Sequence, residues 1–290
     1  MKIIVLGSRG FLGSHICQTL KISGHELSTL SYRPEQDNDF KCHLDSVVKS
    51  FGPDVIINAG ASQNGKDDPS ALHDLSFSNI LLPSYLAWAI NNYAPKCVLI
   101  TFGSSWQHFN NEPLPFNAYA ATKTAAEAML EHYAQDGLRA VCLQLYDTYG
   151  PNDGRNKLVN LIADALIRRK VLNMSGGKQQ IDLIHIDDVV SAVVSVIKML
   201  REHDNGCLMK YAICSGRPVS IIRLANIMAQ ARNLDAAEIF NLGFYPYRER
   251  ERFELNSYEP IVPGWEPKIE LANGLVDLML SREKNIYERE

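Results

Sequence analysis

The sequence predicts an α/β protein built on a Rossmann-type, doubly wound parallel sheet, with a smaller C-terminal substrate domain. Strand-like and helical segments alternate through the first half, an apolar segment occupies residues 2–6, and a glycine-rich loop joins that segment to a helix. Three glycines at such a place permit a tight turn, close approach of the backbone to a pyrophosphate, and tight packing of helix on strand. The free N–H groups of the helix start then face the phosphates. The loop residues expected to bind a dinucleotide are Gly7, Ser8, Arg9, Gly10, Phe11, Leu12 and Gly13.

The remaining elements of the first half follow in alternation. Apolar runs predict strands at 26–32, 40–43, 54–58, 97–102 and 139–145. Helical patterns begin at residue 14 and recur at 47–51 and at 118–135. A longer helical region follows residues 59–61 and extends to about residue 93, with breaks at Pro69 and Pro83. This alternation predicts parallel strands with right-handed crossovers and ligands beyond the carboxyl ends of the strands. The loops after residues 6, 32, 59, 102 and 145 are therefore expected to line one cleft.

The second half has less regular patterns. Helices are expected at 157–169, 187–200, 220–233 with Ser220 as N-cap, and 270–280, and a strand at 181–186. Residues 245–253 form a charged loop rich in Arg and Glu. We expect a dinucleotide-binding domain over 1–150 and a substrate-binding domain over 151–290 that shares segments with the first.

The composition argues against several classes of protein. The 290 residues are 46% hydrophobic and 21% charged with a net charge of −4, ordinary values for a soluble enzyme, and no cluster of Lys and Arg predicts nucleic-acid binding. The longest apolar stretch, 80–90, is interrupted by Pro83, so no membrane span is expected. A strand starting at residue 2 leaves no room for a signal peptide, and the six cysteines are scattered, so we expect a cytoplasmic protein. The histidines lack ligand spacing, so no metal is expected.

The end of the second strand indicates the cofactor. Enzymes that use NAD usually carry an acidic residue there to accept from the ribose hydroxyl. This chain has Arg33 at that place, and Arg9 in the glycine loop could reach the same group. Guanidinium groups suit a 2′-phosphate, so NADP(H) is favoured over NAD(H). A displaced carboxylate at Glu35 would instead serve NAD, and both arginines could simply be solvated surface residues.

Tyr119 and Lys123 form the candidate catalytic pair. Their spacing of four puts them on one face of the helix at 118–135. An ammonium beside a phenol favours the phenolate, which makes the tyrosine usable as an acid or base on a carbonyl/alcohol pair. The pair follows a strand end that carries hydroxyl groups, with Ser104 and Ser105 as candidates to bond the reacting oxygen.

These motifs together resemble the extended short-chain dehydrogenase/reductases, and within them the NAD(P)-dependent epimerase/dehydratase group that acts on nucleotide sugars. Besides the glycine loop, the two serines and the Tyr119/Lys123 pair, the resemblance rests on Tyr149-Gly150-Pro151 and on Asp182 with His185-Ile186-Asp187-Asp188. It extends to Gly264–Pro267. Residues 149–157 and 176–182 resemble more narrowly the CDP-abequose synthase-like 4-ketoreductases, which implies O-antigen biosynthesis in lipopolysaccharide assembly.

The resemblance implies further roles for residues of this chain. Tyr119 would be the proton donor or acceptor with Lys123 as its partner, and a helix asparagine, Asn79, would support the fifth strand. Two long helices would form a homodimer interface. The residues that would contact cofactor are Asp45 at the adenine, Ala59, Gly60 and Ala61 at the phosphates and ribose, and Tyr146 and Thr148 at the nicotinamide. The residues expected to contact a nucleotide-sugar substrate are Asn156, Lys157, Arg248 and Arg250.

The chain departs from the family pattern at two places. The usual hydroxyl position falls on Gly103, so Ser104 or Ser105 would have to replace it. The arginine that often precedes Asp182 is Ile181 here, and Arg248, Arg250 or Arg252 could take its place. Alternatively, the charged loop at 245–253, which contains these arginines, is a solvated run of alternating charges.

The fold alone does not choose the reaction. A 4,6-dehydratase would need an acid and a base where this chain has Ser104 and Ser105, so dehydration is disfavoured. We expect reduction of a 4-keto group of a nucleotide-diphosphate deoxysugar. The alternatives are a nucleotide-sugar 4-epimerase with tightly held NAD and a non-catalytic NADP-binding sensor. The nucleotide, the sugar and the stereochemistry stay open.

Overall fold

The chain folds into two compact units that interleave along the sequence. The computed structural model describes residues 1–31, 37–63, 68–109, 112–200 and 206–288. The first unit comprises residues 1–145, 190–213 and 258–265, and the second comprises 146–189, 214–257 and 266–290. Each unit has its own cluster of buried apolar side chains. The expected division of the chain into domains 1–150 and 151–290 stays a prediction.

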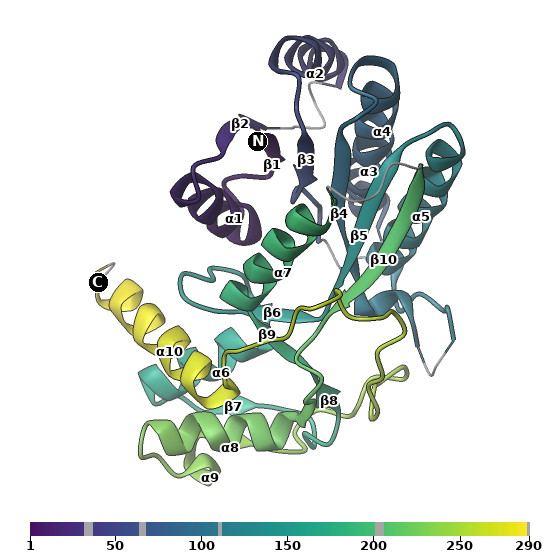
Figure 1. Ribbon diagram of the computed structural model, residues 1–290. Helices are drawn as coiled ribbons and strands as arrows, with labels where there is room; N and C mark the ends of the chain where they lie inside the picture. Colours follow the sequence, from purple (N-terminus) through teal and green to yellow (C-terminus); the bar gives the residue numbers. More distant parts are fainter. Residues whose placement is uncertain (32–36, 64–67, 110–111, 201–205, 289–290) are drawn as a thin grey trace. The chain divides into compact units, whose positions relative to one another are not determined.

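The first unit is built on a six-stranded parallel sheet (Figure 1) with the strand order β10-β5-β4-β3-β1-β2. The strands are β1 (Lys2–Leu6), β2 (Glu26–Leu30), β3 (Val55–Asn58), β4 (Val98–Ser104), β5 (Arg139–Leu145) and β10 (Cys207–Ile213). From β1 the chain first goes outward to β2 and then crosses back to β3. The strand order therefore reverses beside β1, which is where α/β sheets of this kind bind ligands. The predicted Rossmann-like α/β fold is confirmed.

Helices cover both faces of this sheet. The helical segments of the first 145 residues are α1 (Phe11–Ile22), α2 (Asp37–Phe51), α3 (Pro69–Ser76), η2 (Phe77–Leu81), α4 (Leu82–Tyr93), η3 (Ser105–Gln107) and α5 (Ala118–Gln135). On one face α2, α4 and α5 pack against strand residues such as Ile4, Ile56 and Leu99. The helix α1 lies on the opposite face (Figure 1). The helix at 118–135 and the strand at 139–145 have the predicted bounds.

The strand predicted at 40–43 is wrong, because these residues are part of the helix α2. Phe40, Leu44 and Val48 are all buried and are spaced four apart, so they share one face of the helix. The three side chains join the cluster beneath α4. β2 is the edge of the sheet on this side.

Several other helices and strands differ from the predicted ones in their bounds. The predicted break at Pro83 does not interrupt the helical region, because α3, which starts at Pro69, continues through the π-helix η2 into α4, whose first turn contains Pro83. The edge strand β10 was not among the predicted elements, and its first five residues are only half-buried. The last helix runs beyond residue 280, to Tyr287.

The second unit combines short strands with helices around a separate core. Its elements are β6 (Asp147–Tyr149), α6 (Leu158–Arg168), β7 (Leu172–Asn173), β8 (Gln180–Ile181), β9 (Leu183–His185), the start of α7 (Ile186–Met199), β11 (Val219–Ser220), α8 (Ile221–Ala231), α9 (Ala236–Ile239), β12 (Phe240–Asn241) and α10 (Leu271–Tyr287). Ser220 caps α8 as predicted, since its hydroxyl accepts from the Arg223 N–H. Tyr149 is buried among α6, α8 and α10 residues. Across the described part of the chain, the helices are too short or too polar to cross a membrane.

Candidate active site

The glycine loop after β1 has the conformation that a dinucleotide cradle needs. Gly7 has a φ of +73°, and a Cβ there would lie 2.6 Å from the nitrogen of Gly60. A Cβ at Gly13 would overlap the carbonyl oxygen of Gly7. Gly10 is the N-cap of α1, has no side chain to block the first turn, and donates its N–H to the Gly7 carbonyl at 2.9 Å. The first turn of α1 carries no acidic residue, so its positive end is left for an anion.

A cleft of about 270 Å³ opens beside this loop. It is lined by Gly7, Ser8, Arg9 and Gly10 of the loop, by Ser31 after β2, by Gly60, Ala61 and Ser62 after β3, and by Ser78 of η2. The Arg9 guanidinium donates to the Ser31 hydroxyl at 3.3 Å. Gly60 and Ala61 are predicted cofactor contacts, whereas Ser62 and Ser78 carry no motif that would identify them from the sequence.

The cleft fits a dinucleotide because its walls are backbone and small side chains at the start of a helix. Asp45, another predicted contact of the cofactor, is not part of the cleft wall. It lies on α2, where its carboxylate accepts from the Tyr93 hydroxyl at 3.2 Å. Arg33 and Glu35 lie outside the described residues.

Tyr119 and Lys123 lie on one face of α5. Asn117 caps this helix by accepting from the Ala120 N–H at 2.9 Å, so the helix begins directly before the tyrosine. Tyr119 is half-buried, and Lys123 is only 8% exposed. The Lys123 ammonium lies 5.9 Å from the centre of the Tyr119 ring. The structure therefore brings the predicted pair together.

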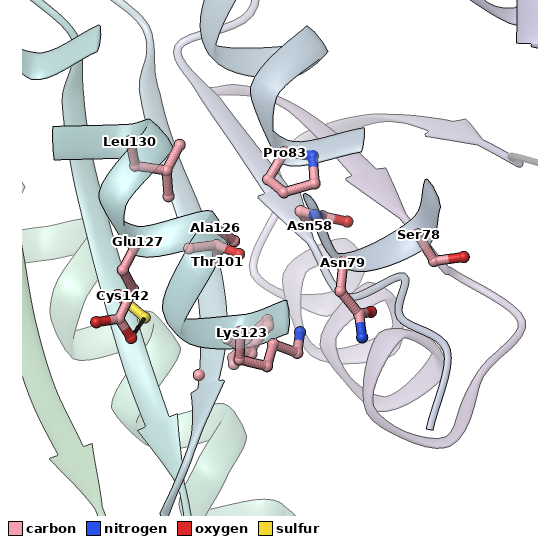
Figure 2. A pocket seen from close by; sticks show the side chains of 12 residues that line it. Asn58, Ser78, Asn79, Pro83, Thr101, Lys123, Ala126, Glu127, Leu130 and Cys142 are labelled. Carbon is pink, nitrogen blue, oxygen red and sulfur yellow. Dashed lines mark hydrogen bonds between the residues drawn. The ribbon is translucent and has the colours of Figure 1, made fainter. Parts of the chain in front are cut away.

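Lys123 reaches into a small second cavity, which Figure 2 shows. The cavity holds about 10 Å³, room for roughly one water molecule. Burial lowers the pKa of Lys123 from 10.5 to about 8, while the nearby Cys142 and Glu127 act to raise it when they are ionised. Asn58, Asn79 and Thr101 also line this cavity.

Asn79 does not support β4 as the resemblance implies. Its side-chain oxygen accepts from the Ser62 N–H at 3.1 Å, and its amide donates to the Ser62 carbonyl at 3.1 Å and to the Thr122 hydroxyl at 3.0 Å. It therefore ties the loop after β3 to α5, one residue before Lys123. Ser78, its neighbour in η2, lines both the cleft and the small cavity. The two spaces therefore adjoin at this turn, whose π-helical form often marks functional sites.

Ser104 and Ser105 are both buried at the end of β4. The Ser104 hydroxyl accepts from the Trp106 N–H at 3.3 Å, which caps η3. The Gln107 side-chain oxygen in turn accepts from the Ser104 N–H at 2.7 Å. This capping box holds the turn in which the two candidate hydroxyls lie.

The side chains around Gly103 leave little room for a side chain at this position. A Cβ there would lie 2.7 Å from the Gln107 side-chain oxygen, 3.1 Å from the Cys142 sulfur and 3.2 Å from a Glu127 oxygen. The departure from the family's hydroxyl position thus leaves space for a polar cluster behind β4. The sequence analysis missed Gln107 and Glu127, although Glu127 follows Lys123 at a spacing of four.

The remaining predicted residues belong to the second unit. The Tyr146 hydroxyl donates to the Asn256 carbonyl at 2.7 Å, and the Thr148 hydroxyl accepts from Arg155 at 3.0 Å. Lys157 lies 3.8 Å from the Asp147 carboxylate, and burial lowers its pKa. Asn156 is exposed.

Arg248 and Arg250 lie in the irregular segment after β12, with Arg248 exposed and Arg250 half-buried. Asp182 is not open to a ligand as a free carboxylate. Its two oxygens accept from the N–H groups of Ser215 at 2.8 Å and Gly216 at 3.0 Å. Within the described part of the chain, no group of three or more His, Cys, Asp or Glu side chains is placed to hold a metal.

Comparison with known proteins agrees with this architecture. Residues 3–213 match the model of the NAD dependent epimerase/dehydratase family. The CDP-abequose synthase of Yersinia pseudotuberculosis is 27% identical over 230 residues, covering 73% of this chain and 78% of that protein. The CDP-abequose synthase of Salmonella typhimurium is 24% identical over 96% of this chain and 97% of that protein. The UDP-glucose 4-epimerase of Rhizobium meliloti is 26% identical over 93% of both chains.

Solved structures share the fold over nearly the whole chain. The UDP-glucose 4-epimerase of Thermotoga maritima, solved with UDP-glucose, superposes with a TM-score of 0.81 at 20% identity and covers 99% of this chain and all of that one. MoeE5 in complex with UDP-glucuronic acid and NAD superposes with a TM-score of 0.80 at 20% identity, over 98% of this chain and all of that one.

Proposed function

Since this chain belongs to the NAD dependent epimerase/dehydratase family, and is therefore an NAD(P)-dependent enzyme that modifies nucleotide sugars, we propose that it reduces the 4-keto group of a nucleotide-diphosphate deoxysugar. The observation that carries the proposal is the Tyr119/Lys123 pair on α5, with the ammonium buried 5.9 Å from the phenol ring. The similarity to two CDP-abequose synthases supports this reaction and a role in O-antigen biosynthesis.

The glycine loop and the cleft beside it would hold the dinucleotide. Gly7 and Gly10 would leave room for phosphates at the start of α1, and Gly60 and Ala61 line the same cleft; Ala59 stays a candidate contact. When bound, the dinucleotide supplies the hydride.

Tyr119 would give a proton to the oxygen at C4. Lys123 makes this possible, because its ammonium stabilises the phenolate that is left behind. The Ser104 hydroxyl accepts one hydrogen bond from the backbone and still has its own hydrogen to donate to the substrate oxygen. Ser105 is the second candidate for that donor.

Arg9 supports NADP(H) over NAD(H). Its guanidinium and the Ser31 hydroxyl lie together on the wall of the cleft, a pair of donors that suits a dianionic 2′-phosphate. Arg9→Ala should raise the KM for NADPH at least tenfold and leave the KM for NADH unchanged. Equal effects on both cofactors would refute this role.

The second unit would bind the nucleotide sugar. Lys157, Asn156, Arg248 and Arg250 are the candidate contacts, and the cationic groups suit a diphosphate. Tyr146 and Thr148 stay candidates for the nicotinamide.

The decisive experiment measures turnover of a panel of 4-keto nucleotide sugars with NADPH and compares Tyr119→Phe with the unchanged protein. The variant should bind NADPH normally but lose roughly 100-fold or more in kcat. Full turnover by the variant would refute the assignment of Tyr119.

A 4-epimerase is the second candidate, favoured by the similarity to the Rhizobium meliloti enzyme. An epimerase oxidises and re-reduces its substrate without releasing the cofactor. Denaturing the purified protein and identifying the released nucleotide separates the two, since retained NAD indicates the epimerase. A non-catalytic NADP-binding sensor would turn over no sugar of the panel.

We also propose a homodimer. Leu81, Trp88 and Met129 are large apolar residues, each more than a third exposed, on η2, α4 and α5 of the first unit. Trp88→Glu should convert a dimer to a monomer in analytical ultracentrifugation.

A further inference from the structure

Glu127 belongs to a row of ionisable side chains on α5. Tyr119, Lys123, Glu127 and Glu131 follow each other at intervals of four residues, so they share one face of the helix. The side chain of Glu127 is 13% exposed, whereas that of Glu131 is 54% exposed. The proposed chemistry uses the first two residues of the row and gives Glu127 no part.

Hydrogen bonds connect Glu127 to the end of β4. Its Oε1 accepts from the Gln107 side-chain amide at 2.7 Å and from the Cys142 thiol at 3.3 Å. The oxygen of the same Gln107 side chain accepts from the Ser104 N–H at 2.7 Å. The carboxylate thereby orients Gln107 so that its oxygen, and not its nitrogen, faces the backbone of the candidate hydroxyl turn.

Glu127 is also held from its other side. Its Oε2 lies 3.0 Å from the Lys210 ammonium of β10, which lies 2.8 Å from Glu131. Burial acts to lower the pKa of Lys210, but the bonds to Glu131 and Glu127 raise it above its usual value, so Lys210 stays a cation. Both oxygens of Glu127 are therefore held by neighbouring side chains, as a group that positions others needs.

Glu127 and Lys123 line the same water-sized cavity (Figure 2). The other ionisable groups facing this cluster are Tyr119 and Glu131 on α5, Cys142 on β5, Lys210 on β10 and His108 after η3. Burial raises the pKa of the Cys142 thiol well above its usual value, so Cys142 is uncharged near neutral pH. Glu127 is therefore the carboxylate that lines this cavity together with Lys123, and its charge acts to raise the pKa of Lys123.

We propose that Glu127 is a positioning residue of the reductase site: its charge favours the ammonium form of Lys123, and through Gln107 it fixes the turn that carries Ser104 and Ser105. This inference rests on the proposed function for the chemistry it serves. Its two parts predict different measurements.

Glu127→Gln tests the electrostatic part, with Glu131→Gln as the matched control. Both changes remove one carboxylate that contacts Lys210, but Glu131 lies one helical turn further from Lys123. The titration of Lys123 is read by NMR on protein labelled with [13Cε]lysine, with Lys123→Arg to assign the resonance. We expect Glu127→Gln to lower the pKa of Lys123, because the Glu127 charge acts to raise it. Glu131→Gln should change it little, and equal titration in both variants would overturn the proposal.

Gln107→Met tests the positioning part, and it also serves if Glu127→Gln does not fold. It removes the link between Glu127 and Ser104 but keeps the charge near Lys123. We expect kcat to fall roughly tenfold to a hundredfold with KM and the Lys123 titration unchanged, because a small displacement of a reacting group is costly. An unchanged kcat would overturn this part. The titrations need no substrate, so they decide the role of Glu127 even if the panel of nucleotide sugars is not turned over and the proposed function fails.

Discussion

The buried ammonium of Lys123 should make the folded chain less stable than it could be, and the penalty should vanish with rising pH. Lys123 is 8% exposed, and burial lowers its pKa from 10.5 to about 8. Lys123→Met keeps the length and most of the volume of the side chain but removes the charge. The variant should lose catalysis and gain stability.

The size of the gain follows from the pKa. Each pH unit by which the pKa of Lys123 differs between the unfolded and the folded chain changes the free energy of unfolding by about 1.4 kcal/mol. The lowered pKa of Lys123 therefore corresponds to roughly 3 kcal/mol. Below pH 8 the lysine is protonated in both states and the whole penalty is present. Between pH 8 and about 10.5 the unfolded chain binds the proton more tightly than the folded one, so the stability of the unchanged protein rises relative to the variant.

Denaturant unfolding without cofactor at pH 7, 8, 9 and 10 measures this difference. We expect Lys123→Met to be more stable by up to about 3 kcal/mol at pH 7, with the gain shrinking towards zero as the pH approaches 10.5. The exposed Lys198 provides a control, Lys198→Met, for the loss of a surface charge. A difference that stays constant with pH, or a variant that is less stable at pH 7, would refute the reasoning.

Three further changes probe other parts of the structure. Gly13→Ala puts a methyl group against the Gly7 carbonyl, so NADPH binding should be lost and the melting temperature lowered, as calorimetry with and without cofactor would show. Asp188→Ala removes the acceptor of the Lys268 and Ile269 N–H groups, at 2.9 and 3.0 Å, and should cost roughly 3 kcal/mol in urea unfolding; a cost near zero would contradict that anchor. Leu44→Ala should cost about 2–5 kcal/mol because Leu44 is fully buried in α2.

Elements with strong local signals were predicted well. The strand at 2–6 and its glycine loop combine an apolar run with residues that serve few other purposes, and the helix at 118–135 has the N-cap Asn117 next to its first turn. The pairing of Tyr119 with Lys123 also follows from sequence alone, because helical spacing puts residues four apart on one face.

Segments with ambiguous patterns were predicted less well. Phe40 and Leu44 fit a short strand as well as a helix when only neighbouring residues are considered, and the packing of α2 against α4 decides for the helix. Residues 207–213 alternate weakly, and their pairing with β5 makes them the strand β10. Asp45, which the resemblance assigned to the adenine, lies within the helix α2 and bonds to Tyr93.

The amino-acid sequence by itself therefore determined the class of the fold, the position of the glycine loop and the pairing of Tyr119 with Lys123, since each depends on residues close together in the chain. Only the tertiary structure decided what surrounds Lys123. Glu127, Gln107, Cys142 and Lys210 come from α5, η3, β5 and β10, and their contacts exist only once the sheet has formed. The glycine at 103, a departure from the family pattern in the sequence, is explained by this cluster, because the space that a side chain would need is already filled.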